Sequence, residues 1–310
     1  MFGTVLASPT RPRGDGDSRV RGTEPSAAPQ RHRAWDRAGT GVPLVRAFRL
    51  AYDGRPFYGF QRQPDVRTVE GTLLSTLESG GIVDAGETPP GYAAAGRTDA
   101  GVSAVEQTVA FDAPDWCTPA ALNGRLPGSI RAWAAADVPD GFHATHDAAR
   151  RHYTYQLHAP DADDAAAREA AAGLSGEHDF HNVTSDESGT IRDVSVEVER
   201  DDEFLVVTVA AGGFPRGFVR RLVGVLAEVA VEGQPLARVD EVLGDESLQG
   251  GKGVPRMPPE PLVLTGVDYP NVEFVVDDEA IGSARTVFEE RRIAALERQR
   301  VAETVLSGLR

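Results

Sequence analysis

The residues best suited to chemistry stand together in one segment, Ala95-Gly96-Arg97-Thr98-Asp99-Ala100-Gly101-Val102-Ser103-Ala104. Its carboxylate, Asp99, lies between two glycines, with Arg97 two residues before it and Thr98 beside it. The glycines permit positive φ angles and a close approach of a ligand to the backbone. Because a protein core has no use for a charged pair on a loop, this segment indicates a functional site.

Three other segments carry residue types that bind phosphates or stack on bases. They are residues 52–64 (YDGRPFYGFQRQP), residues 150–155 (RRHYTY) and residues 212–221 (GGFPRGFVRR). For residues 52–64, an ordinary connecting loop with a few buried rings is an equally good interpretation. For residues 150–155, two tyrosines on one strand face are often simply core residues. In the third, the helical phase places Arg220 near an apolar stripe, where a buried guanidinium needs a carboxylate partner.

Composition indicates a globular protein, with 41% hydrophobic and 25% charged residues among 310. No apolar run approaches the ~20 residues that span a bilayer, and the N-terminus lacks the apolar core of a signal peptide. Cys117 is the only cysteine, so a disulfide within the chain and a cysteine-based metal cluster are both excluded. These features predict a cytoplasmic protein without a membrane partner.

The formal net charge of −15 ordinarily argues against a nucleic-acid partner. However, Lys252 is the only lysine, whereas Asp and Glu total 47. An acid-rich and lysine-poor composition resembles that of proteins from salt-accumulating halophiles. In molar salt the Debye length is about 3 Å, so distant acidic residues hardly repel a polyanion, and local arginine clusters matter more than the total charge.

Hydrophobic periodicity predicts an α+β protein built from two halves with the same order of elements. In residues 45–145 we expect strands at 45–52, 91–95, 105–111 and 130–133, and helices beginning after Thr68 and Thr118. In residues 146–272 we expect strands at 153–157, 194–198, 203–210 and 262–267, and helices at 163–172 and 216–231. Each order, β-α-β-β-α-β, is that of a ferredoxin-like unit. The halves should form one largely antiparallel sheet with a central active-site cleft where they meet.

The two ends of the chain differ from these halves. Residues 1–44 have seven arginines, four acidic residues and no apolar periodicity, which predicts a disordered tail. A basic RNA-binding arm and a mis-assigned start, with initiation near Val45, are the alternatives. Within residues 273–310, a long charged helix is expected over 279–308, either closing the fold as a surface helix or facing a partner.

Taken in order, these segments resemble the tRNA pseudouridine synthase A family. The resemblance runs from about Ala47 to Tyr269, and its most specific motifs are GRTDAGV and the later VRRLVG. The other matching segments are YDG-PFYGFQ-QP, TVEGTL, LNGRLP, RRHYTY, GEHDF and PLVLTGVDY.

The resemblance implies an isomerase that converts uridine to pseudouridine in the anticodon arm of tRNA, at positions 38–40, without metal or cofactor. Asp99 would be the nucleophile or base that breaks the glycosidic bond, with Arg220 holding it ionised. Tyr153 would stack on the target base. A homodimer that binds tRNA across both subunits is also implied by the resemblance.

Residues expected to bind the substrate follow from the same resemblance. Arg97 occupies the place of the arginine that holds the flipped nucleotide, next to Thr98, and Leu264 would form a wall of the pocket. Three departures affect peripheral RNA contacts. Ser103 replaces the usual histidine, Thr145 replaces an arginine, and the Pro-x-Gly-Leu motif reads Pro259-Glu260-Pro261-Leu262.

The sequence leaves two alternatives to this function, a zinc protein and an RNA-binding module without activity. The histidines His143, His146, His152, His178 and His181 suggest zinc, but the 178/181 pair falls in a glycine-rich loop of the resemblance and no further ligand cluster accompanies it. A catalytically inactive, ferredoxin-like RNA-binding module is the second alternative. A glycine-flanked carboxylate argues against it, because that charge would weaken RNA binding.

Overall fold

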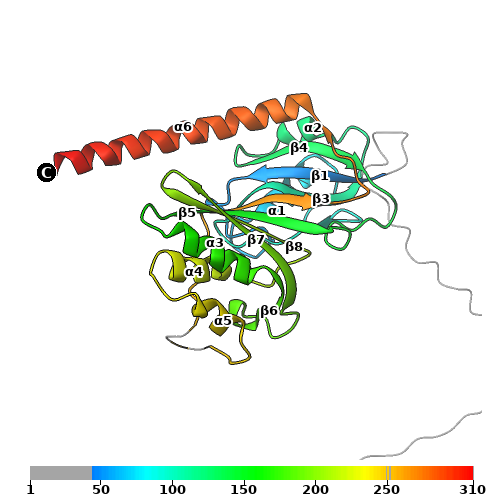
Figure 1. Ribbon diagram of the computed structural model, residues 1–310. Helices are drawn as coiled ribbons and strands as arrows, with labels where there is room; N and C mark the ends of the chain where they lie inside the picture. The colour runs from blue at the N-terminus through cyan, green and yellow to red at the C-terminus, as the bar shows by residue number, and fades with distance from the viewer. Residues whose placement is uncertain (1–43, 249, 251–252, 310) are drawn as a thin grey trace, which may run out of the picture. The chain divides into compact units, whose positions relative to one another are not determined.

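Figure 1 shows the chain as a computed structural model, which describes residues 44–248, 250 and 253–309. The predicted tail falls outside the described residues except for the backbone of Leu44.

The first half contains the expected elements in the expected order. They are β1 (Leu44–Tyr52), α1 (Val69–Ser79), β2 (Ala93–Ala94), β3 (Ser103–Ala113), α2 (Pro119–Asn123) and β4 (Ile130–Asp137). Both helices begin as their sequences indicate. The hydroxyls of Thr68 and Thr118 accept N–H groups three residues ahead, and Pro119 opens α2.

The second half repeats this order with additions. Its elements are β5 (Arg150–His158), α3 (Asp164–Leu174), β6 (Gly176–Asp179), the 3₁₀ turn η1 (His181–Val183), β7 (Ile191–Asp201), β8 (Phe204–Ala211), α4 (Phe218–Ala230), α5 (Ala237–Leu243) and β9 (Leu262–Asp268). After them come β10 (Val275–Val276) and α6 (Asp278–Gly308). The glycine-rich loop expected around His178 and His181 is wrong. His178 lies in β6, a polar strand that forms because it pairs with β7, and His181 opens η1.

The described strands form one mixed sheet that is mostly antiparallel, in the order β10-β4-β1-β3-β9-β5-β8-β7-β6, with β2 on β3. The first half contributes β4-β1-β3-β2, and the second contributes β9-β5-β8-β7, which is the same order. Of the described strands, only β3 and β9 pair in parallel, with Ser103 opposite Val263 and Ala104 opposite Leu264. Strand β3 of the first half and β9, the last strand of the second half, are therefore neighbours at the junction of the halves.

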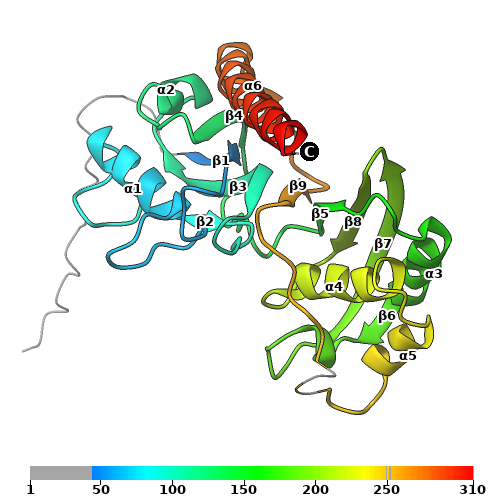
Figure 2. The same cartoon turned by 90° about the vertical axis from the view of Figure 1, so that its left-hand side faces the viewer.

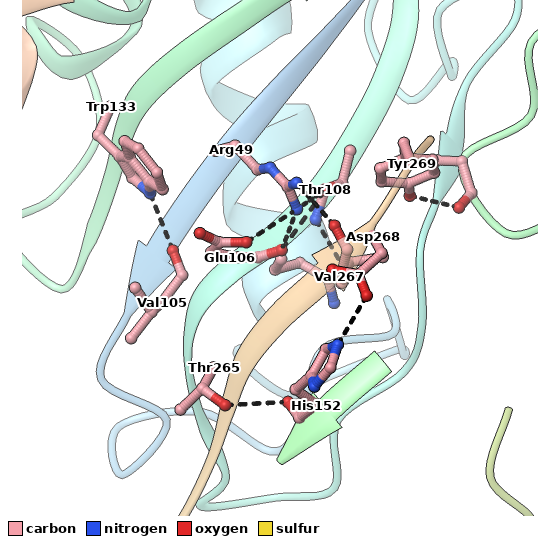
Figure 3. Close-up of polar contacts among 12 residues, drawn as sticks. Arg49, Val105, Glu106, Thr108, Trp133, His152, Thr265, Val267, Asp268 and Tyr269 are labelled. Atoms are coloured by element: carbon pink, nitrogen blue, oxygen red, sulfur yellow. Dashed lines mark hydrogen bonds and ion pairs between the residues drawn. The ribbon is translucent and has the colours of Figure 1, made fainter. Parts of the chain in front are cut away.

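Polar contacts hold this junction together (Figure 3). The Arg49 guanidinium of β1 donates to the carbonyl of Val267 in β9 at 2.7 Å and to Oγ1 of Thr108 in β3 at 3.0 Å. Burial lowers the pKa of Arg49, against the charge of Glu106 that raises it. On β5 and β9, His152 Nε2 lies 2.8 Å from Asp268 Oδ2. These bonds fix the relative register of four strands.

The apolar faces of the helices complete the core. Figure 2 shows α3, α4 and α5 grouped beside β5 to β8, and α1 beside the strands of the first half. The stripe predicted for α4 is buried, with Phe218, Leu222 and Val225 at most 1% exposed. On α1, Leu73 and Leu77 are fully buried. Sequence periodicity therefore identified the inward faces correctly.

The long charged helix expected near the C-terminus is present as α6. The carboxylate of Asp277 caps it by accepting from Ala280 N at 3.0 Å, and it also accepts from Ala120 N in α2 at 3.1 Å. Farther along, Arg291 forms an ion pair with Asp53, which also binds Arg55. Burial alone would raise the pKa of Asp53, but the hydrogen bonds and charge of the two arginines lower it. The N-terminal part of α6 is thus bound to residues of the N-terminal half, by hydrogen bonds at Asp277 and by the ion pair of Arg291.

Among the described residues, no helix combines the length and the apolar character required to cross a membrane.

Candidate active site

Asp99 lies in the loop between β2 and β3, and the backbone of this loop is tightly turned. The N–H of Val102 donates to the carbonyl of Asp99 at 3.2 Å. Gly101 has φ +85°, and a Cβ there would lie 3.0 Å from Pro259 Cγ. The positive φ expected from the sequence is therefore confirmed at Gly101, and the contact with Pro259 leaves no room for a side chain there. Gly96 has no positive φ, so that expectation is wrong for it.

The loop is held by the segment that follows β1. The hydroxyl groups of Thr98 and Tyr52 are 2.8 Å apart, and Phe60 N donates to Thr98 O at 3.0 Å. Gly59 passes so closely that a Cβ would lie 2.9 Å from Thr98 O. Thr98 is buried, so in this structure its side chain positions the loop that carries Asp99.

Two arginines converge on the Asp99 carboxylate. Arg220 Nη1 of α4 donates to Asp99 Oδ2 at 3.2 Å, and Arg256 Nη2 donates to the same oxygen. Arg220 also donates from Nε to Met257 O at 2.5 Å, and its side chain is only 12% exposed. Asp99 is thus the carboxylate partner that the helical phase of Arg220 required. The Asp99 side chain keeps 30% exposure, so it remains accessible to a ligand.

Sequence reasoning missed Arg256, which lies in an irregular segment between α5 and β9. This segment packs against α4, since a Cβ on Gly224 would lie 2.2 Å from Pro255 O. The Met257 N–H donates to Arg220 O at 3.2 Å and fixes the segment further. The only signal in the sequence was an arginine between prolines, at Pro255 and Pro258.

Tyr153 and Leu264 lie opposite each other on β5 and β9, and Leu264 is also opposite Ala104 of β3. Both side chains are buried, and the Tyr153 ring meets the Phe214 ring edge-on, with centroids 5.3 Å apart. Burial raises the pKa of Tyr153 to about 12, the charge of Asp99 adds to this, and Arg151 opposes it. The phenol therefore stays protonated at neutral pH and serves as a neutral ring.

Arg97 is exposed, and no hydrogen bond or ion pair joins its guanidinium to another of the residues that the structure describes. Two of the three family departures have local hydrogen-bond partners. Ser103 Oγ accepts from Gly54 N at 3.0 Å, and Thr145 Oγ1 donates to Ala94 O at 2.5 Å. Neither residue is placed against the Asp99 carboxylate.

A second missed residue, Arg151, supports the loop from behind. Its guanidinium donates to Ala95 O at 2.7 Å, to Thr145 O at 2.6 Å and to Gly212 O at 2.5 Å. Burial lowers the pKa of Arg151. Four carbonyl contacts thus connect the end of β2 with the end of β8, so the loop carrying Asp99 is fixed to the second half.

Within the described part of the chain, no three His, Cys, Asp or Glu side chains gather in a way that could hold a metal ion. His178 Nε2 instead lies 3.0 Å from the carbonyl of Ser175. The arrangement around Asp99 is that of a partly exposed carboxylate held by guanidinium groups, with a protonated phenol and an apolar leucine on the neighbouring strands. Such a site suits nucleophilic or basic chemistry on a substrate that binds against an aromatic ring.

Known proteins that are similar to this chain give its family. The family model described as tRNA pseudouridine synthase matches residues 170–270. The tRNA pseudouridine synthase A of Haloarcula marismortui is 56% identical over 275 residues, which is 86% of this chain and 100% of that protein. The protein of the same name from Natronomonas pharaonis is 56% identical over 85% of this chain and 98% of its own. That from Thermococcus kodakarensis is 40% identical over 81% of this chain and 95% of its own.

These similarities define the class as isomerases that convert uridine to pseudouridine in tRNA. The chain belongs to the tRNA pseudouridine synthase A family. Among solved structures, the archaeal box H/ACA sRNP Nop10–Cbf5 complex matches 60% of this chain and 43% of its own, with 15% identity and a TM-score of 0.33.

Proposed function

We propose that this chain isomerises uridine to pseudouridine at positions 38–40, in the anticodon arm of tRNA, with Asp99 as the catalytic carboxylate. The observation that carries the proposal is the pairing of Asp99 with Arg220 in an accessible loop. The family membership supports the tRNA substrate, because the relatives above are named for that activity.

The reaction breaks the bond between uracil N1 and ribose C1′ and forms a bond between uracil C5 and C1′. The proton on C5 is lost and N1 gains one, so no atoms are added or removed. Asp99 acts either as the nucleophile at C1′ or as the base that starts the cleavage, and both roles need an ionised carboxylate. Arg220 stabilises that ionised form by a charge-assisted hydrogen bond.

The neighbouring residues receive roles that match their environments. Tyr153 stacks on the released uracil as a neutral ring, and Leu264 limits the pocket on the side of β9. Arg97, exposed on the same loop as Asp99, binds the nucleotide after it has flipped out of the stem. Thr98 assists by keeping the loop in place for the substrate.

We also propose the organisation that the resemblance implies. Residues 45–145 and 146–272 are two ferredoxin-like halves with the active-site cleft between them, and the shared strand order supports this. The enzyme acts as a homodimer in the cytoplasm of a salt-accumulating archaeon, as the acid-rich, lysine-poor composition favours. Sedimentation as a monomer at micromolar concentration would contradict the dimer.

The test of the function is to map pseudouridine in bulk tRNA from a strain that lacks this gene. We expect loss of pseudouridine at one or more of positions 38–40 and its recovery with the wild-type gene. An unchanged pattern would refute the tRNA assignment. The inactive RNA-binding module is tested by Asp99→Ala, which should fail to restore pseudouridine although the purified variant still binds tRNA.

A further inference from the structure

A groove away from the Asp99 carboxylate has the charge that an RNA strand requires. It runs along α1 and the turn after α2 and has a volume of about 640 Å³. Its lining includes three arginines, Arg62, Arg67 and Arg125, and five hydroxyl residues, of which Thr72, Ser75 and Ser79 are at least partly exposed.

The guanidinium groups of this groove form no ion pair within the described residues, although the Glu70 carboxylate accepts the backbone N–H of Arg62 at 2.6 Å. All three arginines are exposed. No aspartate or glutamate is among the described residues that line the groove, although the whole chain carries a net charge of −15. Arg67 is held over the buried ring of Phe57, 4.8 Å from its centroid. The groove is therefore a local positive surface on an acidic protein.

The hydroxyl groups indicate which polyanion fits. Thr72 Oγ1 donates to Thr68 O at 2.8 Å, and Ser79 Oγ donates to Thr76 O at 2.9 Å. Since their protons are used within the helix, their oxygens remain available as acceptors. Phosphate groups offer only acceptors, whereas the ribose 2′-hydroxyl can donate to such an oxygen. Arginines for phosphates and hydroxyl oxygens for ribose together favour RNA.

The groove is joined to the Asp99 loop by one segment of backbone. The carbonyls of Gly59 and Phe60 accept Val69 N at 3.1 Å and Glu70 N at 2.8 Å, so they hold the start of α1. The same Phe60 donates its N–H to Thr98, next to Asp99. An RNA strand that presents a nucleotide to Asp99 can therefore continue onto a surface whose position is fixed relative to that loop.

We infer that this groove binds the phosphodiester backbone of the RNA strand that flanks the target uridine. The inference rests on the proposed function, since it takes the substrate to be tRNA. It adds a binding surface that begins at α1 and lies outside the residues assigned to the reaction.

The test compares two triple variants with equal loss of charge. Arg62→Gln/Arg67→Gln/Arg125→Gln removes the groove cations, and Arg168→Gln/Arg192→Gln/Arg298→Gln removes three arginines elsewhere. The dissociation constant for tRNA is measured over a range of KCl in which circular dichroism shows both variants folded. We expect the groove variant to bind tRNA at least about tenfold more weakly than the control variant. The slope of log Kd against log[KCl] should be smaller by about two to three. The loss of activity should appear mainly as a rise in KM, with kcat little changed.

Equal affinity and equal slope in the two variants would overturn the inference, while wild-type pseudouridine formation in the same assay would leave the proposed function intact. If the groove variant is unstable, Arg62→Gln/Arg125→Gln keeps Arg67 on Phe57 and gives the same comparison with a slope change of about one to two. Competition by poly-glutamate as strong as that by tRNA, abolished in the groove variant, would assign the groove to an acidic protein and also overturn it.

Discussion

The Nη1 atom of Arg220 lies 3.2 Å from the Oδ2 atom of Asp99, although 121 residues separate the two in the chain. The pair joins a helix of the second half to a loop of the first. Arg256 donates to the same oxygen, so both guanidinium groups hold Oδ2 and neither donates to Oδ1. This leaves Oδ1 as the oxygen that faces the substrate in our account.

Removal of the two arginines should therefore have graded effects. We expect Arg220→Ala to lower the single-turnover rate of pseudouridine formation by about 10²–10³-fold, as for the loss of a preorganised charged donor. Arg256→Ala should lower it less, because Arg220 remains on the same oxygen. Arg168→Ala, on the exposed face of α3, is the matched control and should leave the rate unchanged. Equal rates for Arg220→Ala and the control would contradict the pairing as a catalytic feature.

The buried tyrosines lead to a second prediction, which is a loss of folding stability at alkaline pH. Burial raises the pKa values of Tyr153 and Tyr155 to about 12, above the ordinary value of 10.0. A raised pKa in the folded state contributes stability that is fully present below pH 10 and is lost as pH rises toward 12. The free energy of unfolding, measured by urea titration, should fall across this window. Tyr153→Phe should remove part of that fall, and an identical fall in the variant would be the contrary result.

Gly224 tests the contact between α4 and the segment that carries Arg256. A Cβ at this position would lie 2.2 Å from Pro255 O, so Gly224→Ala must push the segment away from Arg220. We expect a loss of about 1–3 kcal/mol in the free energy of unfolding, as for overpacking, and a reduced rate. Gly282→Ala on α6 has open space at its Cβ and should be neutral or stabilise by roughly 0.5–1 kcal/mol. Similar results for both variants would show that the contact is unimportant.

Much of the fold could be predicted because its elements have strong local signals. The alternating apolar residues of β1, β3 and β7, the caps of α1 and α2 and the apolar stripe of α4 each determine an element without help from distant residues. By contrast, β6 is a polar sequence that becomes a strand by pairing with β7. The two-residue strand β10 and the short helix α5 have too few residues to show a period.

The residues of the candidate site also fall into two groups, those with a local sequence signal and those without one. Asp99 stood out because it is a charged residue between glycines, and Arg220 because a charge fell on an apolar helical face. Arg256 could not be found, since its position depends on how an irregular segment packs over Gly224. Arg151 looked like part of a basic run, and only the tertiary structure shows its guanidinium buried among carbonyl groups. Contacts between segments distant in sequence leave no periodic signal.

The composition leads to a prediction about salt. At low ionic strength the 47 acidic residues repel one another, and this repulsion is screened as the Debye length falls from about 10 Å at 0.1 M to about 3 Å at 1 M. We therefore expect activity to rise with KCl and then reach a plateau, although RNA binding alone weakens with salt. Initial rates and circular dichroism at stepped KCl concentrations measure both effects. An activity maximum at low salt, followed by steady loss, would contradict the halophilic assignment.

The most direct test of the account is the rate of pseudouridine formation by Asp99→Asn, which keeps the size of the side chain and removes its charge. Purified wild-type and variant proteins are incubated with a tRNA transcript, and pseudouridine is mapped at each uridine of the anticodon arm. We predict modification at one or more of positions 38–40 by the wild type and a rate at least about 10³-fold lower for the variant, with tRNA binding retained. A variant rate within about tenfold of the wild type would contradict the assignment of Asp99 as the catalytic carboxylate.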